Sequence, residues 1–237
     1  MYKCSRQLAL VHLLLAMALF SLSSPVFASN VWMVAVPVAN VRAAPQGDAA
    51  LVTQLPRGEK VTLVGRQGVW LQVELPDNQL AWMHQVTVTQ AVDFFGLSLQ
   101  NAERSELREA IKAAGVEVVR EVSAYPYDLY NPAPWWTGAT EMAVGYTPED
   151  QMFAIAEITF RSQDDTEQVR EIAEQVQDDL GDWDSVSGRR AEGPVEFEWQ
   201  QGGVRVLVHR GWPDTTTYLT YEIPERFARL QAALQSR

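Results

Sequence analysis

Side chains that commonly carry out catalysis are scarce in this sequence of 237 residues. Its histidines are His12, His84 and His209, and its one cysteine is Cys4. The sequence contains no HExxH pair, no GxSxG turn for a nucleophilic serine and no glycine-rich phosphate loop. We therefore expect no zinc or other metal site, no catalytic residue of these classes and no cofactor.

Carboxylates are plentiful, and paired carboxylates are what a glycoside hydrolase needs, at a separation of roughly 5–10 Å. They occur in the clusters Asp164-Asp165, Asp178-Asp179 and Asp182-Trp183-Asp184. The last cluster resembles a calcium loop only in its first and third positions, because Val186 stands where an oxygen ligand belongs. The clusters are typical of solvated helix faces, and a carboxylate-based hydrolase stays open as an alternative.

Aromatic residues gather in one proline-rich stretch, AYPYDLYNPAPWWTG, over residues Ala124–Gly138. We interpret it as a connection between strands. Aromatic faces bind sugar rings, prolines and cations, so its aromatic residues are candidate ligand contacts. They are Tyr125, Tyr127, Tyr130, Trp135 and Trp136. The alternative is that these rings fold back and cover an edge or a face of a sheet.

The first 28 residues have the order of a secretory signal peptide. Basic residues in Met1–Arg6 precede an apolar run, Leu8–Phe20, and a small-residue segment ends at Ala28 before Ser29. We expect cleavage there, a periplasmic or secreted product and no membrane insertion after cleavage. An uncleaved N-terminal anchor is the alternative. Because Cys4 lies within this segment, the exported chain would have no disulfide bond.

Negative charge is concentrated in the C-terminal part of the chain. The formal net charge is −11, and residues 91–237 hold 13 basic against 26 acidic residues. Such a surface repels nucleic acid and anionic lipid. It favours solubility or a cationic partner, and nucleic acid is excluded as the expected partner.

Residues 31–90 show the alternation and turn signals of a small β-barrel. Glycine-, proline- and asparagine-rich breaks separate four apolar strands. The expected strands are Leu51–Leu55, Lys60–Gln67, Trp70–Leu75 and Leu80–His84.

The same segment resembles the bacterial Src-homology-3-type (SH3) domain. The resemblance rests on an ordered set of residues: Asn40-Val41-Arg42, Pro45, Leu55, Gly58, Val61, Val64, Gly68, Trp70, Val73 and Trp82-Met83-His84. The chain departs from the family pattern at Ala43-Ala44, where the family has Ser-Gly, and at Ala81, where it has Gly. Since both departures replace glycine, the turns there are expected to differ.

What the resemblance implies is envelope targeting by a non-catalytic module, with Arg42, Trp70 and Trp82 as candidate ligand contacts. Two roles remain open for Arg42. A structural role would have its side chain bond to the backbone or to a nearby acid such as Glu74. A functional role would be a ligand or interdomain contact.

Residues 92–237 alternate helical and strand patterns, which indicates an α+β domain. Apolar residues at helical spacing predict helices over Asn101–Ala114, Asp164–Leu180 and Pro224–Leu234. Strand alternation predicts hairpins over Thr140–Phe160 and Val195–Arg210, and a further strand in Thr215–Ile223. The order helix, glycine, strand, hairpin occurs twice, so a duplicated unit is one interpretation.

The expected architecture is thus a signal peptide (1–28), an SH3-like barrel (31–90) and an acidic α+β domain (92–237). The expected function is that of an envelope binding or adaptor protein, not an enzyme, whose partner is a cell-wall peptide, peptidoglycan or an envelope protein. The alternatives are the carboxylate hydrolase in residues 92–237 and an inhibitor or assembly factor of an envelope enzyme. Nothing in the sequence specifies the oligomeric state.

Overall fold

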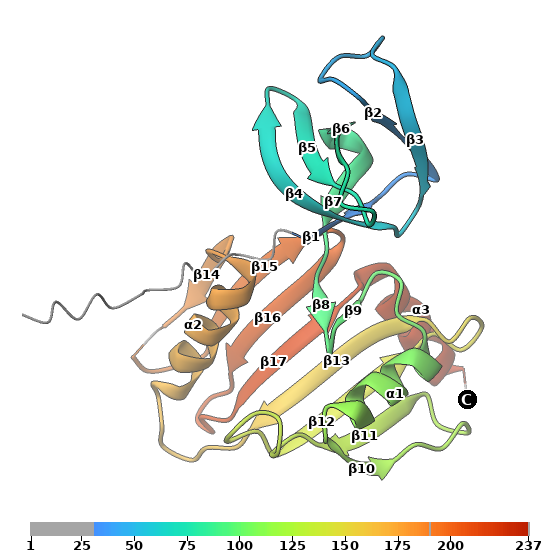
Figure 1. Cartoon of the computed structure of the whole chain (residues 1–237). Helices are drawn as coiled ribbons and strands as arrows, with labels where there is room; N and C mark the ends of the chain where they lie inside the picture. Colours follow the sequence, from blue (N-terminus) through green and yellow to red (C-terminus); the bar gives the residue numbers. More distant parts are fainter. Residues whose placement is uncertain (1–30, 190, 237) are drawn as a thin grey trace, which may run out of the picture.

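The computed structural model describes residues 31–189 and 191–236. The predicted signal peptide lies outside these residues. Among the described helices, none has the length and apolar character needed to cross a bilayer. The expected fold class is confirmed: a small β-barrel is followed by an α+β domain (Figure 1).

Seven antiparallel strands build the N-terminal barrel, in the order β3-β2-β6-β5-β4-β1-β7. The four predicted strands are present within a residue at their ends, and β1, β2 and β7 add to them. A short 3-10 helix, Gln85–Thr87, precedes β7. The strands are β1 (Val31–Val34), β2 (Val38–Arg42), β3 (Leu51–Pro56), β4 (Lys60–Gln67), β5 (Trp70–Glu74), β6 (Leu80–His84) and β7 (Val88–Gln90).

The second domain is built on an eight-stranded antiparallel sheet, in the order β10-β11-β12-β13-β17-β16-β15-β14. Both predicted hairpins are present, as β12 with β13 and β15 with β16. The strands are β10 (Glu117–Arg120), β11 (Tyr127–Asn131), β12 (Glu141–Tyr146), β13 (Phe153–Phe160), β14 (Ser185–Gly188), β15 (Val195–Gln201), β16 (Val204–Arg210) and β17 (Thr217–Glu222).

The sheet consists of two halves with the same order of elements. In the first half α1 (Arg104–Ala113) precedes β10 to β13, and in the second half α2 (Gln168–Leu180) precedes β14 to β17. The halves meet where β13 pairs antiparallel with β17, with Ile158 opposite Leu219 near the centre. The repeated order of elements predicted from the sequence is therefore present in the fold.

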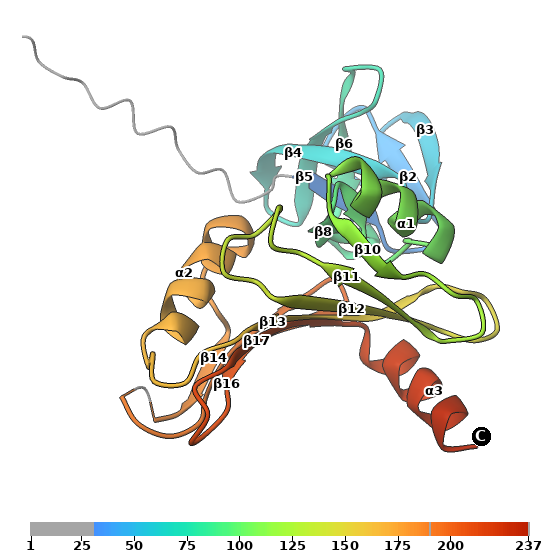
Figure 2. The ribbon, with the colours of Figure 1, turned by 90° about the horizontal axis from the view of Figure 1, so that it is seen from below.

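The helices cover the two faces of the sheet unequally. Leu107 of α1 and Ile172 of α2 belong to the main core, whereas Leu230 of α3 (Pro224–Gln235) packs in a separate cluster with Ala154 and Ile155. Figure 2 shows α3 on the opposite side of the sheet from α1 and the barrel. Strand alternation explains this division, because successive side chains point to opposite faces.

Two of the three helices begin later than predicted. Helix α1 begins at Arg104 and α2 at Gln168. Before α2, the carboxylate of Asp165 accepts hydrogen bonds from the backbone N–H groups of Glu167 and Gln168 at 3.0 and 3.1 Å. Asp165 thus forms a turn that leads into the helix and does not belong to its first turn.

A short hairpin between the two domains covers the centre of the sheet. Its strands are β8 (Asp93–Phe94) and β9 (Leu97–Ser98), and Figure 1 shows it between α1 and α2. Phe94 is 3% exposed and lies 5.2 Å, ring to ring, from Tyr221 of β17. Because Val92 and Leu99 are also fully buried there, the connection between the domains is part of the sheet domain's core.

Candidate functional site

One outward face of the barrel gathers aromatic side chains from neighbouring strands. Trp70 of β5 lies opposite His84 of β6, and Trp82 of β6 lies opposite both Gln72 of β5 and Arg42 of β2. Residues between them, such as Leu71 and Met83, are fully buried. We call the outward residues Trp70, Trp82 and His84 the aromatic face of the barrel. The structure thus brings the three predicted barrel residues Arg42, Trp70 and Trp82 onto one side.

His84 and Arg42 also hold their surroundings in place. The rings of Trp70 and His84 meet edge to face with 5.3 Å between their centroids, and Nδ1 of His84 accepts a hydrogen bond from the backbone of Val86. The guanidinium of Arg42 donates to the carbonyl of Ala49 at 2.7 Å. This bond is of the backbone type expected for a structural Arg42, and it ties down the loop between β2 and β3.

The aromatic stretch in residues 124–138 is not the plain connection that the sequence predicted, because its middle is the strand β11. Alternation along β11 sends Tyr127 and Tyr130 to opposite faces of the sheet. Tyr130 is 1% exposed and donates a hydrogen bond to Glu121 at 2.9 Å, while Tyr127 packs beside Leu230 of α3. Burial raises the pKa of both phenols. The structure therefore does not unite these tyrosines in one surface.

Of the other three aromatic residues of this stretch, Tyr125 lies by itself, whereas Trp135 and Trp136 meet edge to face with 5.5 Å between their ring centres. Tyr125 is half exposed, and the guanidinium of Arg120 lies 4.5 Å from its ring centre. Trp135 packs 4.3 Å from Phe95 of the β8–β9 hairpin, and Trp136 donates a hydrogen bond to Gln175 of α2 at 2.9 Å. The two tryptophans pack against the β8–β9 hairpin and against Phe160 of β13, in line with the alternative that these rings fold back onto the sheet.

The strongest buried charge cluster joins α1 to β11. Asp128 is fully buried and accepts paired hydrogen bonds from Arg104 and Arg108, at distances from 2.7 to 3.1 Å. Burial alone would raise the pKa of the Asp128 carboxyl, but the bonds from Arg108 and Arg104 outweigh it and lower the pKa below 3.8. Every oxygen of this carboxylate is occupied, so the cluster holds the fold together and offers no free acid or base.

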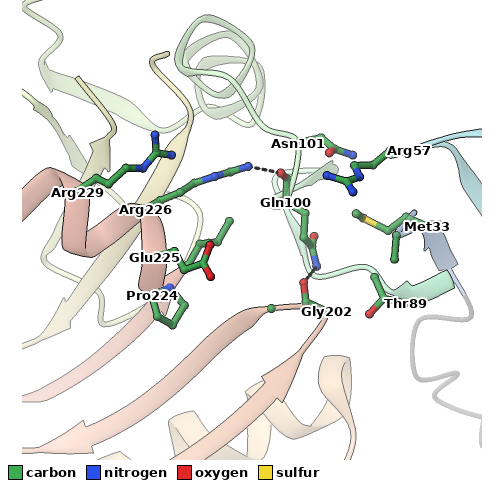
Figure 3. A pocket seen from close by; sticks show the side chains of 13 residues that line it. Met33, Arg57, Thr89, Gln100, Asn101, Gly202, Pro224, Glu225, Arg226 and Arg229 are labelled. Carbon is green, nitrogen blue, oxygen red and sulfur yellow. Dashed lines mark hydrogen bonds between the residues drawn. The ribbon is translucent and has the colours of Figure 1, made fainter. Parts of the chain in front are cut away.

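A cleft lies between the barrel and the sheet domain, with a volume of about 880 Å³. Its walls come from the barrel, from the end of the connection, from the β15–β16 turn and from the start of α3. Figure 3 shows Arg57 on the barrel side and Arg226 and Arg229 on the α3 side. The sequence analysis missed this site, since its residues come from segments far apart in the chain and follow no motif.

Close polar contacts fix the base of this cleft. The amide of Gln100 donates to the carbonyls of Gln90 in the barrel and Gly202 in the sheet domain, at 3.4 and 3.3 Å. The amide of Asn101 donates to the carbonyl of Gly58 at 3.4 Å. Lys60 of β4 pairs with Asp93 of the connection at 3.0 Å. The cleft is therefore part of a built contact between the two domains.

Within the described part of the chain, no group of three or more His, Cys, Asp or Glu side chains is placed to hold a metal ion. His84 lies on the barrel. His209 lies on β16, half buried and stacked on Tyr218 with 5.1 Å between ring centres, and its burial lowers its pKa. The two histidines thus have separate local roles.

Comparisons with known proteins bear mainly on the barrel. No curated protein matches the chain. Among solved structures, it is similar to the crystal structure of a DUF4309 family protein (YjgB) from Bacillus subtilis subsp. subtilis str. 168, at 14% identity and a TM-score of 0.35, covering 56% of this chain and 86% of that chain. A similarity at this TM-score carries no argument about function. Residues 37–89 match the family model described as the bacterial SH3 domain, so the N-terminal barrel is a bacterial SH3 domain.

Proposed function

We propose that this protein is an exported, non-catalytic binding protein of the cell envelope, whose SH3 barrel recognises a cell-wall peptide or a protein partner. The family match supports a binding module. The order of charged, apolar and small residues before Ser29 supports export.

The observation that carries the proposal is that the aromatic face stays clear of the domain contact. The barrel meets the connection and the sheet domain through β1, β7, the β3–β4 turn and the first residue of β4. The contacting residues are Met33, Gly58, Lys60 and Gln90. Trp70, Trp82 and His84 lie on β5 and β6, away from those contacts. Flat, partly exposed rings with polar edges are the residues that most often anchor a bound peptide.

Co-sedimentation with purified cell-wall sacculi tests the proposal, together with capture of partners from an envelope extract. The chain beginning at Ser29 should bind one of the two, and Trp82→Ala should reduce the retained fraction several-fold, as expected for an aromatic anchor. Trp212→Ala is the matched control, because Trp212 is 48% exposed on the sheet domain. It should leave binding unchanged.

The proposal fails if neither material retains the protein, or if a folded Trp82→Ala variant binds as well as the unaltered chain. A zymogram separates it from the hydrolase alternative. We expect no cleared band in a gel that contains peptidoglycan, and a cleared band lost on substitution of one carboxylate would overturn the non-catalytic assignment.

A further inference from the structure

The interdomain cleft concentrates positive charge in a protein that is otherwise strongly acidic. Arg57, Arg226 and Arg229 line it, and Glu225 is the one acidic residue among the described residues that line it. The whole chain has a formal net charge of −11. Three guanidinium groups in one cleft are therefore not explained by composition.

Arg57 is the most available of these groups. It lies in the turn between β3 and β4, is exposed, and faces the cleft from the barrel (Figure 3). Across residues 31–189 and 191–236, its side chain has neither a carboxylate nor a carbonyl partner. Its five N–H donors are thus free for an acceptor that enters the cleft.

The two arginines of α3 face the cleft from the other side. The guanidinium of Arg226 donates to the carbonyls of Gln100 and Phe153 at 2.8 and 3.2 Å, so its charge is not matched by a bonded carboxylate. Arg229 has only a loose, half-exposed pairing with Asp150, at 3.6 Å. Both retain donors for a further acceptor.

The start of α3 argues for carboxylates and against phosphate. Phosphate sites at helix starts use several free backbone N–H groups. Here Pro224 has no N–H, and the N–H groups of Arg226 and Phe227 already donate to the carbonyl of Ile223. Glu225 also places a negative charge in the first turn, where it opposes a dense anion. Guanidinium forks bind carboxylates without needing the free backbone N–H groups that are missing here, and their place on two separate walls suits a ligand with two separated acidic groups.

We propose that this cleft binds a small molecule or short peptide that carries two carboxylate groups, one held by Arg57 of the barrel and the other by Arg229 beside Arg226. The volume of about 880 Å³ lies within the range of roughly 300–1,000 Å³ usual for small-ligand sites. Such a ligand bridges the two domains. The site shares no residue with the aromatic face, so an experiment on diacid binding does not test the function proposed above.

Titration calorimetry with N-acetyl-glycyl-glutamate, which has two carboxylates, tests this site on the chain beginning at Ser29. We expect the diacid to bind, to bind less tightly as salt is raised, and to bind more tightly than its monoamide. Arg57→Gln should weaken binding about tenfold, which corresponds to about 1.4 kcal/mol. Arg66→Gln is the matched control: Arg66 is an exposed arginine of β4 that does not line the cleft, and its loss should change nothing.

A variant that gains affinity separates ligand binding from a structural role. Glu225→Gln removes the acidic side chain that lines the cleft, and it should tighten diacid binding about threefold through lost repulsion. The proposal is overturned if the diacid does not bind, if Arg57→Gln binds it as well as the unaltered chain does, or if Glu225→Gln weakens it. Inorganic phosphate binding as tightly as the diacid would overturn the assignment to carboxylates.

Discussion

Asp128 shows how a single buried carboxylate organises the first half of the sheet domain. Its two oxygens are shared by Arg104 and Arg108, and Arg104 also donates to the carbonyl of Tyr125 at 2.9 Å. The side chain of Arg104 is 7% exposed and that of Asp128 is fully buried, so water replaces little of this interaction. One acid therefore connects α1, β11 and the loop before β11.

Replacing this acid should be strongly destabilising. In Asp128→Asn, two nearly buried guanidinium groups lose their counter-charge, and we expect the free energy of unfolding to fall by about 3 kcal/mol at pH 7. Urea denaturation of the unaltered chain and of Asp128→Asn measures this fall in the free energy of unfolding. Glu141→Gln is the control, since it removes an ion pair with Arg161 in which both side chains are well exposed, and its effect should stay below about 0.5 kcal/mol.

The same substitution should alter the response to acid. Because the pKa of Asp128 is lower in the folded chain than in the unfolded chain, its stabilisation is complete above pH of about 4 and is lost as the pH falls through the folded value. The stability of Asp128→Asn should therefore decline less steeply below pH 4 than that of the unaltered chain. Parallel declines would show that this carboxylate is not held as described.

At this scale the sequence revealed residue types but not their partners. The helical pattern over Asn101–Ala114 placed Leu107, Ala110, Ile111 and Ala114 on one face. Leu107 and Ile111 are buried as expected, whereas Ala110 is partly buried and Ala114, after the last residue of α1, is exposed. Arg104 and Arg108 are one turn apart on the same helix, so the sequence already places their two positive charges on one side of it. Nothing in the chain marks Asp128 as their partner, because it lies within an aromatic strand about 20 residues away.

Among the elements, the sequence predicted some strands with their bounds and missed others. β4 and β6 have the predicted bounds. The repeated order of elements predicted a strand after Gly115, and β10 lies there although its first three residues are all exposed. We interpreted the segment that contains β11 as a connection because it holds several tyrosines and prolines flank it, and prolines are typical of connections. Pairing with β12 decides its conformation, and local sequence does not.

Helix α2 carries an unfavourable charge at its C-terminal end. Asp178 and Asp179 lie in its last turns, where no basic residue is present and the helix dipole disfavours negative charge. Asp179 is exposed, but partial loss of its surrounding water, followed by the charge of Asp178, raises the pKa of its carboxyl. The folded state therefore disfavours the charged form of Asp179 at neutral pH.

Asp179→Asn should consequently stabilise the protein, by about 0.5 kcal/mol at pH 7. A raised folded pKa means that the penalty is absent below the unfolded value and develops as the pH rises, so the gain should disappear as the pH falls below about 4. Chemical denaturation of both proteins at pH 7 and at a pH below 4 measures this difference in the free energy of unfolding. Asp165→Asn, at the start of the same helix, should give no gain, because there the negative charge is favourable. A loss of stability in Asp179→Asn would contradict this explanation.

Two glycines lie where the two domains approach each other most closely. A Cβ atom added at Gly58 would lie 2.4 Å from Nδ2 of Asn101, and one added at Gly202 would lie 2.4 Å from the carbonyl oxygen of Gln90 in the barrel. The turn of β15 with β16 was predicted from its two glycines, but its contact with the barrel was not. Gly202 and Gln90 of the barrel are more than 100 positions apart in the chain, and alternation and turn signals report only local geometry.

Gly202 and its neighbour Gly203 form a matched pair for testing this contact. Both have positive φ, 58° and 80°, so alanine at either position costs about 1 kcal/mol in backbone strain. A Cβ at Gly203 would meet nothing within 4 Å, whereas a Cβ at Gly202 would strike the barrel. We expect Gly202→Ala to lose more stability than Gly203→Ala and to loosen the domain contact.

Limited proteolysis distinguishes the two effects. If the barrel is pushed away, the connection over residues 91–101 loses the bonds of Gln100, and it should be cut faster in Gly202→Ala than in Gly203→Ala. Backbone strain alone would change the cleavage rate of both variants by the same amount. Equal cleavage rates would therefore mean that the barrel does not rest on the β15–β16 turn, and the arginines of the cleft would then have no fixed geometry across the two domains.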